Sequence, residues 1–184
     1  MSDLDAVLAE VASALNTAVV DYMVIGGIAG IAWGIRRGTF DIDFTVALDA
    51  SEMPRLLDIL GTSVAASPAD PVDFAAETGV LPVQHRSGTR IDFALARIAY
   101  AHEALHRAVT IRVAGVPVKF CTPEDLILHK IISLRERDRS DVEALIALRR
   151  NSLDRTYLDA HVHELAWLLD DPSIEERYAA LLAG

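Results

Sequence analysis

Residues 40–46, Phe-Asp-Ile-Asp-Phe-Thr-Val, alternate between two kinds of side chain with a period of two. Successive side chains of a β-strand point to opposite faces, so this pattern predicts a strand with Asp41 and Asp43 on one face and apolar residues on the other. Two neighbouring carboxylates repel each other unless a positive charge lies between them. Oxygen ligands of this kind favour Mg²⁺ or Mn²⁺. The segment therefore predicts a strand and a candidate metal site together.

The remainder of the first 120 residues mixes strand and helix patterns. Apolar spacing predicts a helix over 4–18 and a buried strand at 22–25 that closes in a tight turn at Gly26-Gly27, followed by a short helix over 28–34. Further along we expect a helix at 53–60 capped by Ser51, a loop with a helical turn at 67–79, strands at 80–84 and 90–95, a helix at 99–107, and a hairpin of strands at 109–113 and 116–120.

The last third of the chain is helical in pattern. Thr122 and Pro123 are typical of the first positions of a helix, and helical spacing continues to residue 183, with breaks near 137–140, 151–154 and 170–172. We therefore expect an α/β (α+β) fold: a small mixed β-sheet flanked by helices over 1–120, and a C-terminal helical bundle over 121–184 packed on that core.

Composition excludes several classes of protein. Hydrophobic residues make up 52% of the 184, too many for a disordered chain, yet no apolar run reaches the length of a membrane span. The N-terminus has no basic segment typical of a signal peptide, and the single Cys121 excludes an internal disulfide. We expect a cytoplasmic protein with no membrane partner. The net charge of −10 disfavours tight non-specific binding of nucleic acid.

A third carboxylate, Asp92, is the lone acid in the predicted strand 90–95. If this strand pairs beside 40–46, three carboxylates converge, and three acids can hold two Mg²⁺ ions for an in-line displacement. Asp92 could instead form an ion pair with Arg90 or Arg97. Similarly, the acids of 40–46 could lie on a solvated edge strand.

Glycines in a strand–turn–helix arrangement let backbone N–H groups approach a phosphate closely. Gly26 and Gly27 fit that arrangement, although a Gly-Gly pair is often only a turn. The conjunction of this pair with Asp41, Asp43 and Asp92 favours a site for a metal and a nucleotide.

Residues 24–46 together with Asp92 resemble the core of the nucleotidyltransferase superfamily of the DNA-polymerase-β type. Residues 37–43, Arg-Gly-Thr-Phe-Asp-Ile-Asp, and the segment 128–141 are similar to the AbiEii-type toxin nucleotidyltransferases and their uncharacterised relatives. The hydroxyl of the common Gly-Ser form is absent, because Gly27 and Ile28 stand there. The chain is also short for a full toxin of this type.

The resemblance implies roles for particular residues. Asp41, Asp43 and Asp92 would be the catalytic, metal-binding acids, with Asp92 helping to deprotonate the acceptor hydroxyl. The residues expected to contact the nucleotide or its phosphates, directly or by steering another residue, are Gly26, Gly27, Arg37, Thr39, Lys130, Asp138 and Asp141.

Other interpretations of some of these residues stay open. Lys130 could extend its amine to solvent from an apolar helix face. Arg37 could pair with Asp41 instead of stabilising pyrophosphate. The run of arginines and acids over 135–141 is typical of a solvated turn with weak ion pairs.

The sequence thus predicts a Mg²⁺- or Mn²⁺-dependent enzyme that moves a nucleoside monophosphate from an NTP such as ATP to a hydroxyl. The acceptor could be tRNA, a protein side chain or a small molecule, and the toxin resemblance adds an antitoxin partner. One alternative is an inactive module of the same fold that binds a nucleotide or a protein partner. Another is a metal-free structural protein with surface acids.

Overall fold

The computed structural model describes residues 3–183, which form two units. The first unit comprises residues 3–28 and 38–121, and the second comprises 29–37 and 122–183. Helix α2 (Gly26–Ala32) begins in the first unit and ends in the second.

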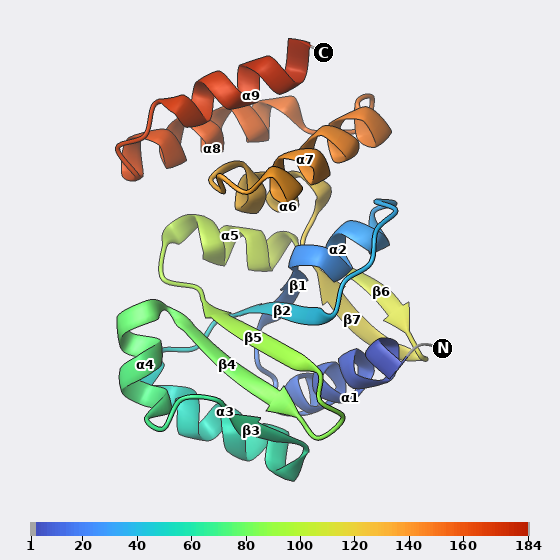
Figure 1. Ribbon diagram of the computed structural model, residues 1–184, viewed down its shortest axis with the longest axis vertical. Coiled ribbons are helices and arrows are strands. Elements are labelled where there is room, and N and C mark those ends of the chain that lie inside the picture. The colour runs from blue at the N-terminus through green and yellow to red at the C-terminus, as the bar shows by residue number, and fades with distance from the viewer. Residues whose placement is uncertain (1–2, 184) are drawn as a thin grey trace. The chain divides into compact units, whose positions relative to one another are not determined.

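A seven-stranded mixed sheet organises the first unit, in the order β3-β4-β5-β2-β1-β7-β6 (Figure 1). Its strands are β1 (Tyr22–Ile25), β2 (Asp41–Val46), β3 (Val64–Ala66), β4 (Val80–His85), β5 (Arg90–Leu95), β6 (Val109–Val113) and β7 (Val116–Phe120). The pairs β2–β5 and β1–β7 are parallel and the other pairs are antiparallel. The predicted small mixed sheet flanked by helices is confirmed.

Helices cover this sheet and connect its strands. They are α1 (Asp3–Thr17), α3 (Met53–Leu60), α4 (Pro71–Thr78) and α5 (Ala99–Arg107), with short 3-10 turns at Ala50–Glu52 and Gly61–Ser63. Helix α1 packs against β7 and α3, while α4 packs against β4. Central aromatic rings join neighbouring strands: Phe44 stacks on Phe93 at a centroid distance of 5.2 Å, and Tyr22 meets Phe44 edge-on at 5.8 Å.

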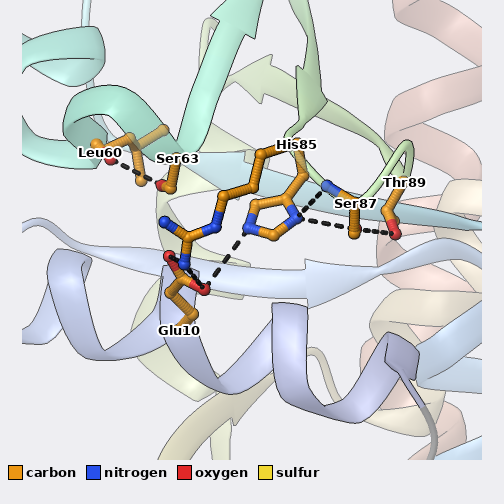
Figure 2. Close-up of polar contacts among 7 residues, drawn as sticks. Glu10, Leu60, Ser63, His85, Ser87 and Thr89 are labelled. Atoms are coloured by element: carbon orange, nitrogen blue, oxygen red, sulfur yellow. Dashed lines mark hydrogen bonds and ion pairs between the residues drawn. The ribbon is translucent and has the colours of Figure 1, made fainter.

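A polar cluster fastens α1 to the end of β4 (Figure 2). The backbone N–H of Ser87 donates to Nδ1 of His85 at 3.1 Å, and Nε2 of the same ring lies 3.4 Å from Oε2 of Glu10. His85 is buried, and the exposed Arg86 also pairs with Glu10 at 2.9 Å. Ser87 therefore provides a hydrogen-bond partner for Nδ1 of the buried His85, and Glu10 links α1 to the end of β4 through Arg86.

The second unit is a helical bundle of α6 (Pro123–Ile131), α7 (Glu136–Arg149), α8 (Arg155–Leu168) and α9 (Ser173–Ala183), shown in orange to red in Figure 1. Thr122 caps α6 by accepting a hydrogen bond from the N–H of Asp125 at 3.1 Å, as its sequence predicts. The end of α2 belongs to this unit, where the guanidinium of Arg149 lies 5.5 Å from the centre of the Trp33 ring.

Several local predictions are wrong. Gly26 and Gly27 are the first residues of α2 and do not form a separate turn before it. Ser51 lies inside a 3-10 turn, and Glu52 takes the N-cap position of α3. The helical turn predicted within the loop 67–79 is longer than expected: it is an eight-residue helix, α4, because Asp70 caps it and Pro71 begins it.

Candidate functional site

Three carboxylates lie together on one face of the sheet. In the parallel pair β2–β5, Asp43 is the register partner of Asp92, and Asp41 is the partner of Arg90. Register partners in neighbouring strands point to the same face, so Asp43 and Asp92 stand side by side. All three acids are half-buried, whereas their apolar neighbours Ile42 and Phe44 are fully buried on the other face. The strand pairing that the sequence required for convergence is present.

Gly26 lies directly against one of these acids. Its φ is +67°, and a Cβ added to it would meet Oδ2 of Asp43 at 1.9 Å. Both the backbone conformation and the space therefore require glycine. The first residue of α2 thus leaves its backbone beside a carboxylate, which is the close approach that a phosphate-binding backbone needs.

The other two acids have polar partners. The hydroxyl of Thr39 donates to Oδ1 of Asp41 at 2.7 Å. The guanidinium of Arg90 contacts both oxygens of Asp92, with Nε 3.1 Å from Oδ1 and Nη2 2.8 Å from Oδ2. The hydrogen bond to Asp92, together with the negative charge of the acidic face, raises the pKa of Arg90. Of the two arginines considered as partners of Asp92, Arg90 makes the contact, while Arg97 donates to the backbone carbonyls of Ala75 and Ala76.

These acids have the right chemistry for a divalent cation, but their side chains are not gathered around one point. Over residues 3–183, no three Asp, Glu, His or Cys side chains are arranged to hold a metal ion. A guanidinium holds both oxygens of Asp92. For all three carboxylates to bind one cation, Asp92 would therefore have to release Arg90 and bind the cation in its place.

A second charged cluster lies in the second unit. The ammonium of Lys130, at the end of α6, is 2.7 Å from Oδ1 of Asp138 and 2.8 Å from Oδ2 of Asp141. Nε of Arg37 is 3.0 Å from Oδ1 of Asp141. The side chain of Lys130 is 6% exposed and that of Asp141 is 3% exposed. Two basic and two acidic groups therefore neutralise one another away from water.

The two acids of this cluster belong to a helix. Asp138 and Asp141 lie in the first half of α7 and are buried, which excludes the alternative of a solvated turn over 135–141. The helix break predicted near 137–140 is wrong, because α7 runs through these residues. Burial raises the pKa of Asp138, but hydrogen bonds from Lys130 and Ser133 outweigh it and lower the pKa overall. Their spacing of three residues puts both acids on one helix face, where Lys130 reaches both.

Comparison with known proteins decides the family. A family model described as nucleotidyltransferase of unknown function (DUF6036) matches residues 2–182. The chain belongs to this family. The predicted resemblance to the nucleotidyltransferase superfamily is therefore confirmed. No curated protein matches the chain.

Solved structures share the fold of this nucleotidyltransferase at low sequence identity. The antibiotic-resistance factor ANT(2'')-Ia is 15% identical, with a TM-score of 0.61, and the match covers 97% of this chain and 94% of the other. An antigenic nucleotidyltransferase-like protein from Paracoccidioides brasiliensis is 17% identical with a TM-score of 0.58, covering 95% and 91%. The lincosamide antibiotic adenylyltransferase LnuA is 14% identical with a TM-score of 0.56, covering 80% and 98%.

The ten site residues expected from the sequence fall into two groups. The first unit of the nucleotidyltransferase contains Gly26, Gly27, Thr39, Asp41, Asp43 and Asp92, and the second unit contains Arg37, Lys130, Asp138 and Asp141. Sequence reasoning missed Ser133, which donates to Oδ2 of Asp138 at 2.8 Å, because an isolated serine between helices carries no signal. It treated Arg90 only as a competing ion-pair partner. The exact alternation with Asp92 two residues later already placed both on one strand face.

Along residues 3–183 no helix combines the length and the apolar character that crossing a membrane requires.

Proposed function

We propose that this protein transfers a nucleoside monophosphate from an NTP to a hydroxyl group, using Mg²⁺ or Mn²⁺ held by Asp41, Asp43 and Asp92. The family and the fold support transfer of this general kind. The observation that carries the assignment to these residues is the register of β2 and β5, which sets Asp43 beside Asp92. The position of Gly26 against Asp43 adds a backbone that a phosphate can approach.

Each acid has a proposed task. Asp41, Asp43 and Asp92 would hold the divalent ions through their carboxylate oxygens, and Asp92 would also take part in removing the proton of the acceptor hydroxyl. Divalent ions bound there would neutralise the triphosphate and stabilise the departing pyrophosphate. The hydroxyl of Thr39 holds the orientation of Asp41, so it acts as a positioning residue.

Gly26 and Gly27 are proposed to contact the triphosphate through their backbone N–H groups. Any side chain at position 26 would occupy the space of the Asp43 carboxylate, so the glycine keeps backbone, acid and phosphate within reach of one another. This role needs no side chain from either glycine.

The phosphate contacts predicted for Lys130 and Arg37 stay a prediction. The geometry favours a structural task, because buried carboxylates of α7 already neutralise both cations. To bind phosphate, Lys130 would have to leave Asp138 and Asp141, whose buried charges would then lack its ammonium. Breaking such buried ion pairs costs several kcal/mol. Asp138 and Asp141 act on Lys130 by holding its ammonium in place.

The direct test is calorimetric binding of each NTP with Mg²⁺. We expect the wild type to show saturable binding that requires Mg²⁺, and the variant Asp41→Asn/Asp43→Asn to show none. A matched control is Asp21→Asn/Asp58→Asn, which removes two exposed carboxylates of the same unit and should bind as the wild type does. Equal binding by the wild type and the Asp41/Asp43 variant would overturn the assignment of the site.

A second candidate function is an inactive module that keeps the fold and binds a partner. The observation that favours it is the two-point contact of Arg90 with Asp92, which occupies a proposed metal ligand. The variant Arg90→Met separates the candidates. If Arg90 only competes with the cation, the variant binds Mn²⁺ more tightly than the wild type in a spin-resonance titration. If neither protein binds Mn²⁺, the inactive module is the better description.

For the acceptor we propose a hydroxyl of tRNA, of a protein side chain or of a small molecule. Incubation with each α-labelled NTP and a panel of the three acceptor classes, followed by separation by size, shows which class receives the label. Solved relatives of the fold include ANT(2'')-Ia in complex with adenylyl-2''-tobramycin, which makes small hydroxylated molecules a sensible part of the panel.

The resemblance of 37–43 and 128–141 to AbiEii-type sequences supports the proposal that the protein is the toxin of a toxin–antitoxin pair. Repressible expression tests it: the wild type should arrest growth, and Asp41→Asn/Asp43→Asn should not. Arrest by both proteins would separate toxicity from the proposed chemistry.

A further inference from the structure

Helix α5 of the first unit carries two histidines that none of the proposed functions uses (Figure 1). Residues 102–106 read His-Glu-Ala-Leu-His, so His102 and His106 are four positions apart. Residues at this spacing are neighbours on one face of a helix. Two histidines so spaced, with a glutamate directly after the first, also occur on the zinc-binding helix of one class of hydrolase. The segment therefore has the spacing of a pair of metal ligands.

The packing of α5 leaves this pair of imidazoles in contact with solvent. The buried residues of the helix are Tyr100, Ala101, Ala104 and Leu105. Because a helix turns by 3.6 residues, these four share one side of it, and residues 102, 103 and 106 lie on the opposite side. His102, Glu103 and His106 are all exposed. An ion from solution can therefore reach both rings.

The two rings are also available to a ligand. Neither imidazole forms a hydrogen bond or an ion pair with any residue of 3–183. The histidines of α8 differ, because His161 and His163 each contact a glutamate, at 2.9 and 2.6 Å. A metal ion could therefore bind His102 and His106 without displacing another partner.

The ligand type and the position on the helix indicate which ion would bind. Imidazole nitrogens suit Zn²⁺, Cu²⁺ and Ni²⁺, whereas Mg²⁺ prefers oxygen ligands. His106 lies in the last turn of α5, where the partial negative charge of the helix end favours a cation. Of the charged neighbours on the helix, Glu103 favours a cation and Arg107 opposes it. A divalent transition metal ion fits these features best.

We propose that His102 and His106 bind a divalent transition metal ion such as Zn²⁺ through one nitrogen of each imidazole. Catalytic zinc sites typically have three protein ligands. Over residues 3–183, no three His, Cys, Asp or Glu side chains are arranged to hold a metal ion. The proposed site therefore has two protein ligands, and water completes the coordination. It uses none of the residues proposed to bind Mg²⁺ and nucleotide, so the inference does not rest on the proposed function.

The test is a calorimetric titration of Zn²⁺ into the full chain without a histidine tag. Excess Mg²⁺ is present to compete for exposed carboxylates, because imidazole does not favour that ion. The wild type should bind Zn²⁺, and His102→Asn/His106→Asn should lose this binding. Each single variant should weaken it at least about 10–100-fold, which is the usual cost of losing a residue that only supports a ligand. Equal binding by the wild type and the double variant would overturn the proposal.

The matched control is His161→Asn/His163→Asn, which removes two imidazoles from α8. Residues two apart on a helix do not face each other, so this pair lacks the geometry to share one ion. The control should bind Zn²⁺ as the wild type does. If it loses as much affinity as the α5 variant, the ion binds without regard to spacing and the proposal fails.

Cu²⁺ gives a second measurement that reports the ligands directly. The spin-resonance spectrum of Cu²⁺ bound to the wild type should show coupling to imidazole nitrogens, and the spectrum of His102→Asn/His106→Asn should not. Circular dichroism checks that the variants keep their helices, which we expect because both histidines are exposed. A wild-type spectrum with oxygen ligands alone would place the ion on carboxylates and overturn the assignment to α5.

Discussion

The two charged clusters of this nucleotidyltransferase differ in how their charge is balanced. In the first unit, three half-buried carboxylates share a sheet face with one guanidinium, which is itself 67% exposed. In the second, Lys130 and Arg37 meet Asp138 and Asp141, and no side chain of the four is more than 16% exposed. The first cluster has an excess of negative charge at the surface, and the second is neutral and buried.

That difference suits the first cluster to binding a ligand and the second to stabilising the fold. A buried, paired set of charges is costly to disturb, because removal of one member leaves an uncompensated charge in a medium of low dielectric constant. A surface cluster with excess charge is costly to keep, because like charges repel, and it becomes favourable when an external cation binds. Substitutions should therefore affect mainly stability in the second unit and mainly binding in the first.

The largest effect is expected for Lys130→Met. The change leaves two buried acids with Arg37 alone, and breaking a buried ion pair typically costs about 3–5 kcal/mol of folding free energy. Urea denaturation measures it. The control is Lys119→Met, which removes the other lysine from a pair with Asp21 that is 38% and 64% exposed, and should cost about 0–1 kcal/mol. Equal losses for the two lysines would mean that the second cluster is not the support inferred here.

Gly26→Ala should have the next largest effect. A left-handed backbone costs an L-residue about 1–2 kcal/mol, and the new Cβ must also push the Asp43 carboxylate aside. We expect lower stability and loss of Mg²⁺-dependent NTP binding together. Gly38→Ala is the matched control, because nothing lies within 4 Å of a Cβ there. Normal NTP binding by Gly26→Ala would show that Asp43 and Gly26 do not act together.

Asp43→Asn should raise stability in the absence of metal, whereas the two substitutions above lower it. Asp43 and Asp92 are register partners, and like charges directly opposite in a sheet cost about 0.2–1 kcal/mol. Without metal, we expect the free energy of unfolding to rise by up to that amount. With saturating Mg²⁺, the wild type should gain stability through binding and the variant should not. Denaturation with and without Mg²⁺ measures both. A large loss of stability without metal would place Asp43 among the supporting residues instead.

Much of this fold follows from local patterns. The alternation over 40–46 predicted β2 and its two faces, and Thr122-Pro123 predicted the start of α6. Strand β3 was missed because three residues are too few to show alternation. Only a helical turn was predicted where α4 lies, because Pro and Asp were interpreted mainly as signs of a loop, although Asp70 followed by Pro71 is also a helix start.

The site was only partly predictable, since pairing between distant segments decides it. The sequence placed Asp41 and Asp43 on one face, but the register that sets Asp92 beside Asp43 depends on how β2 and β5 align. The clustering of Asp138 and Asp141 around Lys130 depends on α6 and α7 folding back on each other after residue 131. Local periodicity does not report either of these long-range alignments.

The last effect concerns the pH dependence of the second cluster. Hydrogen bonds from Lys130 and Ser133 lower the pKa of Asp138 below its ordinary value of 3.8, so this carboxylate stabilises the fold above about pH 4 and loses that contribution as the pH falls through its lowered pKa. Ser133→Ala removes one of these bonds and should cost about 0.5–1.5 kcal/mol at neutral pH.

The difference in the free energy of unfolding between Ser133→Ala and the wild type should shrink as the pH falls from 6 toward 2. The reason is that protonation of Asp138 removes the negative charge that strengthens its hydrogen bond with Ser133. Ser152→Ala removes an exposed serine bonded to the carbonyl of Arg149 and should show a difference that does not change with pH. Urea denaturation at several pH values measures both. A difference that is constant for Ser133→Ala would mean that its hydroxyl does not serve the charged form of Asp138. The balance of the buried cluster would then rest on Lys130 and Arg37 alone.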